Sequence, residues 1–295
     1  MFLLVGGDSE IGAATHLHLR TLGKNAVATT RRLEFASSNR PLLDLAADLS
    51  SWEPPPGTSA ACIFTAIARL AACAADPAGS AYINVVQTLT LVERLIAKNI
   101  YVLFLSSNQV FDGSTPQVRA DAPASPVSEY GRQKARAEAG LRKRMLRGEP
   151  VGILRLAKVV SPTMPLLHSW VRALSAGEPI RAFHDMTMAP TPMEQVSGAI
   201  AALLEHRVCG VFQLTGPEDV SYANIAYHLA RQLGADPELV GSVGAIEAGM
   251  PEGSAPRHTT LDSSAMRHRF SITTPGPWCV LESITQRASR EGSGS

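Results

Sequence analysis

The sequence lacks any marked excess of charge of one sign. Its 27 Lys and Arg residues against 26 Asp and Glu residues give a formal net charge of +1 over 295 residues. Such a chain has no long-range field that would attract nucleic acid or an anionic membrane surface, so we expect neither as a partner. A small molecule is the better expectation, and any cationic site for it has to be local.

Cysteine is also scarce, and long apolar runs are missing. The four cysteines form no CxxC pair, so we expect no metal site and no redox-active dithiol; they are Cys62, Cys73, Cys209 and Cys279. The apolar stretch at 1–5 is far too short for a signal peptide or a membrane span. We therefore expect a cytoplasmic protein whose cysteines are reduced.

What the sequence does contain is enough apolar material for one large domain, or for one domain with a smaller lobe, since 45% of it is hydrophobic. Short apolar or β-branched runs recur, each followed by helix-compatible sequence, as is typical of a parallel sheet with helices on both faces. These runs are 2–5, 26–30, 61–66, 101–106 and 151–156. The sequence thus predicts an α/β fold built on a Rossmann-type doubly wound parallel sheet.

The pattern loosens into separate helices beyond residue 161. We expect residues 1–160 to form the sheet domain, 161–290 a smaller and mostly helical substrate lobe, and 291–295 a disordered tail. Helices are predicted at 81–97, 166–175, 193–206 and 222–233 from their apolar periodicity. A strand at 211–214 is predicted to return from the lobe to the main sheet.

The first predicted strand runs into a glycine-containing turn before a helix, at Val5-Gly6-Gly7-Asp8-Ser9-Glu10-Ile11-Gly12. A strand, a tight turn and a helix N-terminus present free backbone N–H groups and the positive end of the helix dipole to a pyrophosphate. Ser9 stands where the fingerprint G-x-x-G-x-x-G has its middle glycine. On this motif alone, a turn with no ligand is as good an interpretation as a dinucleotide site. The residues that would line such a site are Gly6, Ser9, Glu10, Ile11 and Gly12.

The second predicted strand ends in Arg31 and Arg32, about 20 residues past the turn, where the adenosine ribose of a dinucleotide would lie. An Asp or Glu there would bind a free 2′-hydroxyl, whereas guanidinium groups pair with a 2′-phosphate. The sequence therefore favours NADP over NAD. The alternative is that both arginines are solvated surface residues.

Tyr130 and Lys134 are four residues apart, so on a helix both side chains point to the same side. A free phenol, with a pKa of about 10, exchanges protons poorly at neutral pH, and a neighbouring cation is expected to lower that pKa. Ser107 lies upstream at the carboxyl end of a predicted strand, where open α/β folds bind ligands. We predict that these three residues form a catalytic group, although an isolated YxxxK pair would equally suit an exposed helix surface.

Taken with its neighbouring motifs, the sequence resembles the extended short-chain dehydrogenases/reductases. Among them it is most similar to the dTDP-4-dehydrorhamnose reductase family and the related methionine adenosyltransferase beta subunit, over nearly the whole chain. The resemblance rests on Ser106-Ser107-Asn108-Gln109-Val110-Phe111-Asp112-Gly113, Tyr130-Gly131-Arg132-Gln133-Lys134, Ile153-Leu154-Arg155, Pro190-Thr191-Pro192 and Pro256-Arg257-His258-Thr259-Thr260-Leu261-Asp262.

The resemblance implies roles for individual residues. Ser107 would orient the substrate carbonyl, Tyr130 would donate the proton, and Lys134 would tune the phenol and hold the cofactor ribose. On the cofactor side the resemblance adds Asp44 and Leu45 beside the adenine, and Ala66 at a strand end.

On the substrate side, the candidate residues are Ser107, Asn108, Gln109, Lys158 and Arg257. Gln109 stands where the family commonly has a tyrosine and Lys158 where it commonly has a tryptophan, and both are expected to face the sugar. Arg257 is expected either to reach the nucleotide diphosphate or to form a salt bridge that closes the C-terminal lobe.

The implied reaction is hydride transfer from NADPH to a keto carbon of a nucleotide-linked sugar, with Tyr130 protonating the oxygen. Two alternatives stay open: an NAD-dependent sugar-nucleotide 4-epimerase, and a regulatory subunit that binds the dinucleotide without doing chemistry. Dehydration is disfavoured because Asn108 and Gln109 are not acids. The resemblance also leads us to expect a homodimer.

Overall fold

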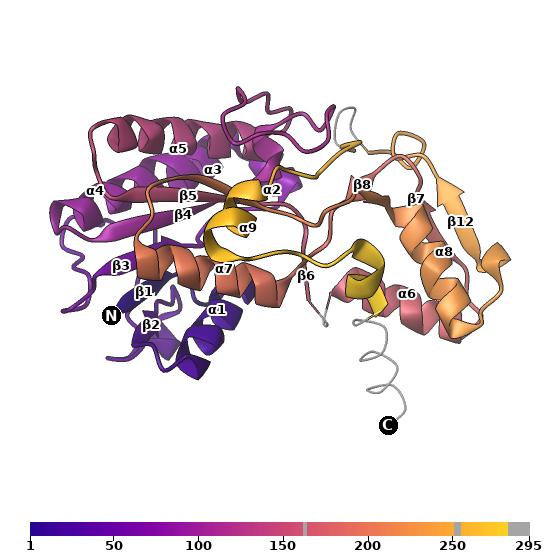
Figure 1. Ribbon diagram of the computed structural model, residues 1–295, viewed down its shortest axis with the longest axis horizontal. Helices are drawn as coiled ribbons and strands as arrows, with labels where there is room; N and C mark the ends of the chain where they lie inside the picture. Colours follow the sequence, from indigo (N-terminus) through magenta and orange to yellow (C-terminus); the bar gives the residue numbers. More distant parts are fainter. Residues whose placement is uncertain (162–163, 251–254, 283–295) are drawn as a thin grey trace.

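A six-stranded sheet runs through the larger part of the computed structural model, which describes residues 1–161, 164–250 and 255–282 (Figure 1). All neighbouring strands are parallel, in the order β10-β5-β4-β3-β1-β2. The strands are β1 (Phe2–Val5), β2 (Ala26–Ala28), β3 (Ala60–Ile63), β4 (Tyr101–Ser107), β5 (Val151–Leu156) and β10 (Gly210–Leu214). The strand order reverses at β1, with β2 on one side and β3 on the other, which is the doubly wound topology that the sequence predicts.

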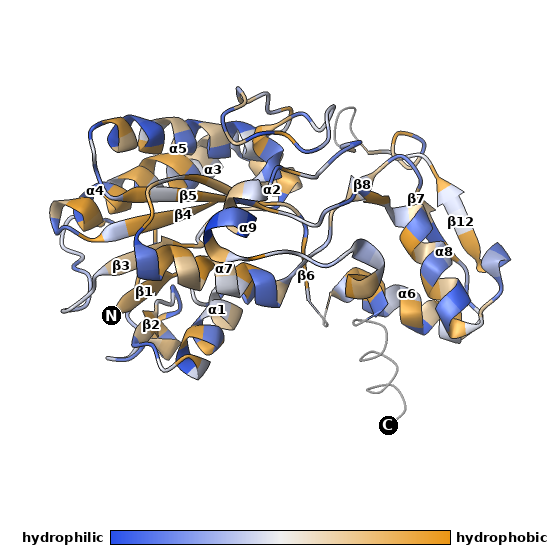
Figure 2. Ribbon diagram, in the orientation of Figure 1, coloured by the Kyte–Doolittle hydropathy of each residue, from blue (hydrophilic) through white to orange (hydrophobic). Residues whose placement is uncertain are grey.

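Helices cover both faces of this sheet (Figure 1). On one face lie α1 (Glu10–Thr21) and α7 (Met193–His206), and on the other α4 (Thr88–Ala97) and α5 (Glu129–Leu146). Within β4, Val102 and Phe104 enter one core while Leu103 and Leu105 enter the other, because side chains alternate along a strand. Residues 102–105 of this strand are therefore apolar on both faces of the sheet. Figure 2 shows an apolar sheet between helices that carry both apolar and polar residues.

The helix expected at 81–97 is composite. It begins as α3 (Pro77–Ala81), continues as the π-helical segment η2 (Tyr82–Gln87) and ends as α4. Single π segments inside helices are rare and often lie at functional sites. Asn84, which is 2% exposed, lies within this segment.

A smaller body packs around its own core beside the sheet (Figure 1). It contains α6 (Pro165–Ser175), α8 (Tyr222–Leu233), the parallel pair β7 (Ile180–Phe183) and β12 (Val240–Val243), and the antiparallel pair β8 (Thr187–Met188) and β11 (Val220–Ser221). The segment expected to form the lobe thus contributes to both bodies, since α7, β10 and α9 (Ser264–Phe270) pack on the main sheet. The expected return of the strand near 211–214 is confirmed by the pairing of β10 with β5.

Short elements make the remaining connections. They are η1 (Leu33–Phe35), α2 (Leu70–Ala75), η3 (Asn108–Val110), β6 (Val159–Val160), β9 (Thr191–Pro192) and η4 (Pro237–Leu239). The parallel pairing of β6 with β9 links the end of β5 to the start of α7. The predicted tail at 291–295 lies outside the described residues.

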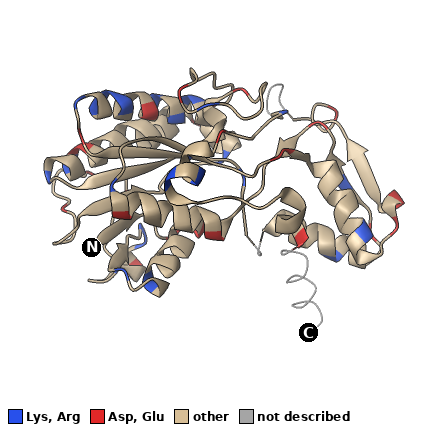
Figure 3. Ribbon diagram, in the orientation of Figure 1, with Lys and Arg blue, Asp and Glu red and all other residues tan. Residues whose placement is uncertain are grey.

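In the described part of the chain, no helix has the length and apolar character needed to span a membrane. The same residues hold no group of three His, Cys, Asp or Glu arranged to bind a metal ion. Basic and acidic residues are interspersed over both bodies in Figure 3. Any concentration of positive charge is therefore local.

Candidate functional site

The glycine turn between β1 and α1 is closed by Ser9. Its hydroxyl donates to the Gly6 carbonyl at 2.7 Å and accepts from the Gly12 N–H at 3.1 Å, so it caps α1. A Cβ on residue 12 would lie 2.5 Å from the Gly6 oxygen, so only glycine allows this close approach. Ser9 itself has φ −77° and ψ 153°, an extended conformation that does not require glycine.

The first turn of α1 retains free donors. The backbone N–H groups of Glu10 and Ile11 bond to no acceptor among the described residues, as expected at positions that no helical carbonyl can reach. Together with the helix dipole they form a cradle that fits a pyrophosphate. The serine at the middle glycine position is therefore compatible with the predicted dinucleotide site.

Three charged side chains, those of Asp8, Arg32 and Arg40, gather where the adenosine ribose was expected. Arg32 lies 3.5 Å from Asp8, and Arg40 also forms a salt bridge with Asp8. Arg31 is exposed and forms no salt bridge with a described residue, although its backbone N–H donates to Asp8 at 3.4 Å. The sequence identified Arg31 and Arg32 but missed Asp8 and Arg40, which come from the turn and from a later loop.

The adenine-side residues differ in what they can offer a ligand. Leu45 is 2% exposed and its side chain belongs to the core, so only its backbone can contact a cofactor. The Asp44 carboxylate is exposed and accepts from the Ala46 N–H at 3.0 Å. Ala66 is partly buried and follows β3, next to Thr65, whose hydroxyl donates to the Val5 carbonyl of β1.

The structure brings the three catalytic candidates to the carboxyl end of β4. Lys134, on α5, donates from Nζ to the Leu105 carbonyl at 2.7 Å, two residues before Ser107. The same Nζ lies 5.8 Å from the ring centroid of Tyr130, one turn earlier on α5. Ser107 caps η3, and a Cβ at Gly131 would lie 2.1 Å from the Gln109 carbonyl, so this glycine lets α5 begin against η3.

The pKa of Tyr130 shifts in the opposite direction to the one expected from a neighbouring Lys134 cation. Burial raises the pKa of Tyr130 well above its ordinary value, and the nearby Cys73 thiol raises it further. Burial also lowers the pKa of Lys134 to about 8, against the opposing charge of Glu138. At neutral pH the phenol is therefore protonated and Lys134 is mostly cationic.

The contribution of Lys134 to the free energy of unfolding, taken as the difference between the wild type and Lys134→Met, is expected to rise with pH from about 8 to 10.5. The Lys134 pKa falls from 10.5 to about 8 on folding, so in this window the Lys134 side chain binds more protons in the unfolded chain than in the folded one. The rise is on the order of 3 kcal/mol, at ~1.4 kcal/mol per pKa unit. Urea unfolding across this pH range checks it, with Lys134→Met as the control that lacks the titrating group. Equal pH slopes for the two proteins would contradict the prediction.

The substrate-side candidates are only partly free to bind a ligand. Ser107 Oγ donates to Asn108 Oδ1 at 3.3 Å, and Gln109 Oε1 accepts from the Ser128 hydroxyl, the N-cap of α5, at 3.1 Å. Lys158 follows β5 and is exposed, and its carbonyl accepts from the Thr191 N–H. Gln109 thus has a structural contact that the expectation of a sugar-facing side chain did not include.

Arg257 is exposed and forms no salt bridge with any residue in the described ranges. Both interpretations of Arg257, as a ligand of the diphosphate and as a salt-bridge partner, therefore stay predictions. Its neighbour His258 donates through its backbone N–H to the Gly113 carbonyl at 2.9 Å. This contact brings the segment of Arg257 beside the loop that follows Ser107 and Phe111.

Asn84 is a residue that the sequence analysis missed. Its amide accepts from the Ile67 N–H at 2.8 Å and donates to the Ile67 carbonyl at 3.0 Å, next to Ala66. It also donates to Gln133 on α5 at 2.7 Å. Asn84 thus ties the loop after β3 to the helix of Tyr130 and Lys134. The sequence signal that could have identified Asn84 as a buried polar residue is its place among the apolar residues of the helix predicted at 81–97.

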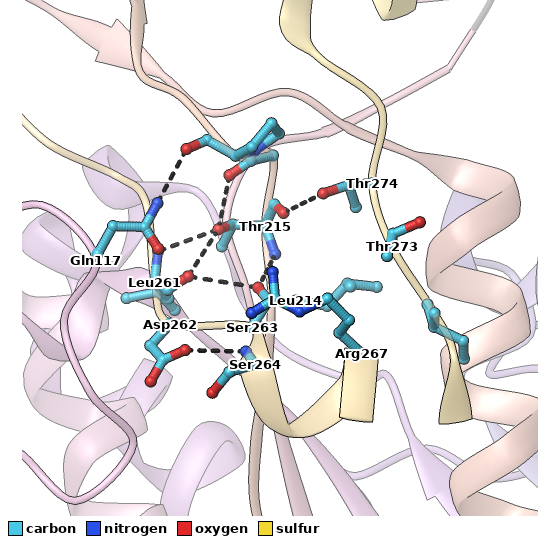
Figure 4. Close-up of a pocket in the computed structure, with 13 residues that line it drawn as sticks. Gln117, Leu214, Thr215, Leu261, Asp262, Ser263, Ser264, Arg267, Thr273 and Thr274 are labelled. Atoms are coloured by element: carbon cyan, nitrogen blue, oxygen red, sulfur yellow. Dashed lines mark hydrogen bonds between the residues drawn. The ribbon is translucent and has the colours of Figure 1, made fainter. Parts of the chain in front are cut away.

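A separate pocket of ≈ 290 Å³ lies at the end of β10 (Figure 4). Thr274 donates to the Thr215 carbonyl across it at 2.7 Å, and Gln117 donates to the Pro217 carbonyl at 2.9 Å. Its remaining lining comes from Leu214, Gly216, Leu261, Asp262, Ser263, Ser264, Arg267, Ile272 and Thr273. None of the residues predicted for the dinucleotide or sugar lines this pocket, so it is distinct from the candidate site.

The doubly wound sheet, the glycine turn after β1 and the Ser107, Tyr130 and Lys134 group after β4 define a protein of the extended short-chain dehydrogenase/reductase type. The family model described as "RmlD substrate binding domain" matches residues 1–286. The chain belongs to this family.

Individual relatives match only part of this chain, at 24–30% sequence identity. A dTDP-4-keto-6-deoxy-D-glucose reductase of Streptomyces niveus is 30% identical over 172 residues, covering 58% of this chain and 59% of the relative. Methionine adenosyltransferase 2 subunit beta of Xenopus tropicalis is 24% identical over 156 residues, covering 50% and 46%. The matches thus span less than two thirds of these relatives. A solved structure of dTDP-4-dehydrorhamnose reductase from Bacillus anthracis strain Ames, in complex with NADP, matches this chain with a TM-score of 0.80 at 15% identity. The match covers 96% of this chain and 98% of that chain, and it shows that the two share a fold.

Proposed function

We propose that the protein is an NADPH-dependent reductase of a keto group on a nucleotide-linked sugar. The observation that carries this proposal is the convergence at the end of β4, where Lys134 is buried against Leu105 and below the ring of Tyr130, beside Ser107. A bound NADPH would supply the hydride that reduces the keto carbon. The similarity to a dTDP-4-keto-6-deoxy-D-glucose reductase supports this substrate class.

The three side chains divide the remaining work. The Ser107 hydroxyl holds the substrate oxygen, and Tyr130 donates its phenolic proton to that oxygen, so the product is the alcohol. The phenol carries its proton at neutral pH, as a donor must, and the raised pKa of Tyr130 is a cost to the transfer that the Lys134 cation has to offset. The mostly cationic Lys134 then stabilises the phenolate that forms.

The preference for NADPH over NADH belongs to the same proposal. Arg32 and Arg40 place two guanidinium groups beside the glycine turn, Arg31 adjoins Arg32 in the chain, and guanidinium groups suit a 2′-phosphate. Arg32 also lies over the exposed ring of Phe35, with 4.3 Å between Cζ and the ring centroid, a surface on which a base could stack.

A two-step measurement tests this function. Calorimetric titrations of the protein with NADPH and with NADH are followed by NADPH oxidation with freshly prepared dTDP-4-keto-6-deoxy sugars. Binding with turnover supports the reductase. Absence of binding to either dinucleotide would refute the site, and NADH binding in preference to NADPH would refute the cofactor assignment.

A second candidate is a regulatory subunit that binds the dinucleotide without chemistry, and the similarity to methionine adenosyltransferase 2 subunit beta favours it. Such a protein would bind NADPH and oxidise none of it with any keto sugar nucleotide. The retained Ser107, Tyr130 and Lys134 favour the enzyme. Single-turnover assays at high protein concentration separate the two candidates.

The proposal extends to assembly and location. The exposed side chains of Tyr82 and Val86 on η2 are apolar surface that a second copy would cover in a homodimer. The four cysteines are all free thiols, as expected in the reducing cytoplasm. Light scattering coupled to size-exclusion chromatography measures the oligomeric state directly.

A further inference from the structure

The glycine turn places a carboxylate among the arginines proposed to bind the 2′-phosphate. We propose that Asp8 is a specificity-determining residue, an internal counter-ion that the 2′-phosphate of NADPH has to displace. Its carboxylate thereby weakens the binding of NADPH relative to NADH. The inference rests on the proposed function, because it takes the adenosine ribose to lie beside this turn.

Both carboxylate oxygens of Asp8 are engaged. Oδ1 lies 3.5 Å from Arg32 Nη2 and also accepts from Arg40, while Oδ2 accepts from the Thr30 hydroxyl at 2.8 Å and the Arg31 N–H at 3.4 Å. The guanidinium groups of Arg32 and Arg40 therefore already have an anionic partner in the free chain. A phosphate has to compete with that partner for both.

The partners differ in their freedom to move. Asp8 has a short side chain that is 20% exposed and is anchored to Thr30, which is 1% exposed. The side chains of Arg32 and Arg40 are long and are 50% and 38% exposed. The arginines can swing toward a phosphate, whereas the carboxylate cannot withdraw. A bound 2′-phosphate would thus lie close to a fixed like charge.

Asp8 also keeps its negative charge at neutral pH. Burial raises the pKa of its carboxyl, but hydrogen bonds from Thr30, Arg40 and the Arg31 N–H outweigh this and hold the pKa below its ordinary value. NADH meets the opposite situation, because its free 2′-hydroxyl can donate a hydrogen bond to a carboxylate. The same residue therefore disfavours one dinucleotide and favours the other.

Removal of the Asp8 charge tests this inference. In Asp8→Asn, calorimetry is expected to show NADPH affinity about tenfold higher, the scale of one like-charge contact near a protein surface. NADH affinity should stay the same or fall. Asp8→Ser keeps an acceptor for Thr30 without the charge and is expected to act in the same direction. Asp48→Asn is the matched control, since the exposed Asp48 bonds to Ser50 and, among the described residues, shares none of these contacts.

A second pair of probes isolates the phosphate. Adenosine 2′,5′-bisphosphate and adenosine 5′-monophosphate differ only in the 2′-phosphate, so the gain in Asp8→Asn should appear with the first and not with the second. Equal changes for both probes, or weaker NADPH binding in Asp8→Asn and Asp8→Ser, would overturn the inference and make Asp8 a scaffold for the arginines. If the wild-type chain binds neither dinucleotide, the proposed function fails, and the inference fails with it.

Discussion

Replacement of Tyr130 by phenylalanine is expected to lower kcat for keto-sugar reduction by about 10²- to 10⁴-fold, the usual contribution of a positioned general acid. The phenol is protonated at neutral pH, so it holds the proton that the substrate oxygen gains. Phenylalanine keeps the ring beside Lys134 and removes only the hydroxyl. Affinity for NADPH should therefore change little, and NADPH oxidation together with calorimetry measures both quantities.

Tyr82→Phe supplies the matched control for this experiment. Tyr82 is 48% exposed on η2 and lies outside the candidate site, so its variant should retain normal kcat and normal NADPH affinity. Normal turnover by Tyr130→Phe would remove Tyr130 from the mechanism. Loss of NADPH affinity in step with kcat would instead assign Tyr130 to cofactor binding.

Much of the fold could be predicted because its elements depend on local patterns. The apolar run at 151–156 coincides with β5, and the periodic segments at 193–206 and 222–233 coincide with α7 and α8. The pairing of β7 with β12 was missed, since these strands are separated by the whole of α7, β10 and α8. The π-helical segment η2 was also missed. Its Asn84 bonds to Ile67 and Gln133, which are distant in sequence, so no local pattern indicates these contacts.

The candidate site was predictable in its residue types and less so in its contacts. The sequence places Ser107, Tyr130 and Lys134 on one strand end and one helix, and Lys134 does bond to β4. It could not show that Arg40 pairs with Asp8 across 32 positions. It also could not show how deeply the phenol is buried, and that burial decides the direction of its pKa shift.

A buried ion pair connects the helix of Lys134 to the centre of the sheet. Arg155 on β5 donates to both oxygens of Glu138 on α5, at 2.9 and 2.7 Å, and the two side chains are 1% and 3% exposed. Arg155 also donates to Gln213 on β10 at 3.0 Å, and its guanidinium carbon lies 4.8 Å from the Phe111 ring centroid. The pair therefore joins α5, two strands and the loop after Ser107.

Breaking this pair from one side is expected to cost about 3–5 kcal/mol of unfolding free energy. Arg155→Met leaves the Glu138 carboxylate buried without its two short bonds, although Arg142 stays near it at 3.9 Å. Glu138→Leu leaves a buried guanidinium in the same way. The double variant removes both charges and should recover most of the loss, because apolar replacements of a buried pair are often neutral. Urea unfolding of the four proteins checks this, and additive losses in the double variant would contradict it.

The double variant also separates stability from chemistry. The Glu138 carboxylate opposes the effect of burial on Lys134, so its removal lowers the Lys134 pKa below about 8. Lys134 then loses its proton nearer to neutral pH, and the alkaline limb of the NADPH oxidation profile should move to lower pH in Glu138→Leu and in the double variant. Arg155→Met alone keeps the carboxylate and should not show this shift. If the double variant is stable and its pH profile matches that of the wild type, Glu138 acts through packing alone.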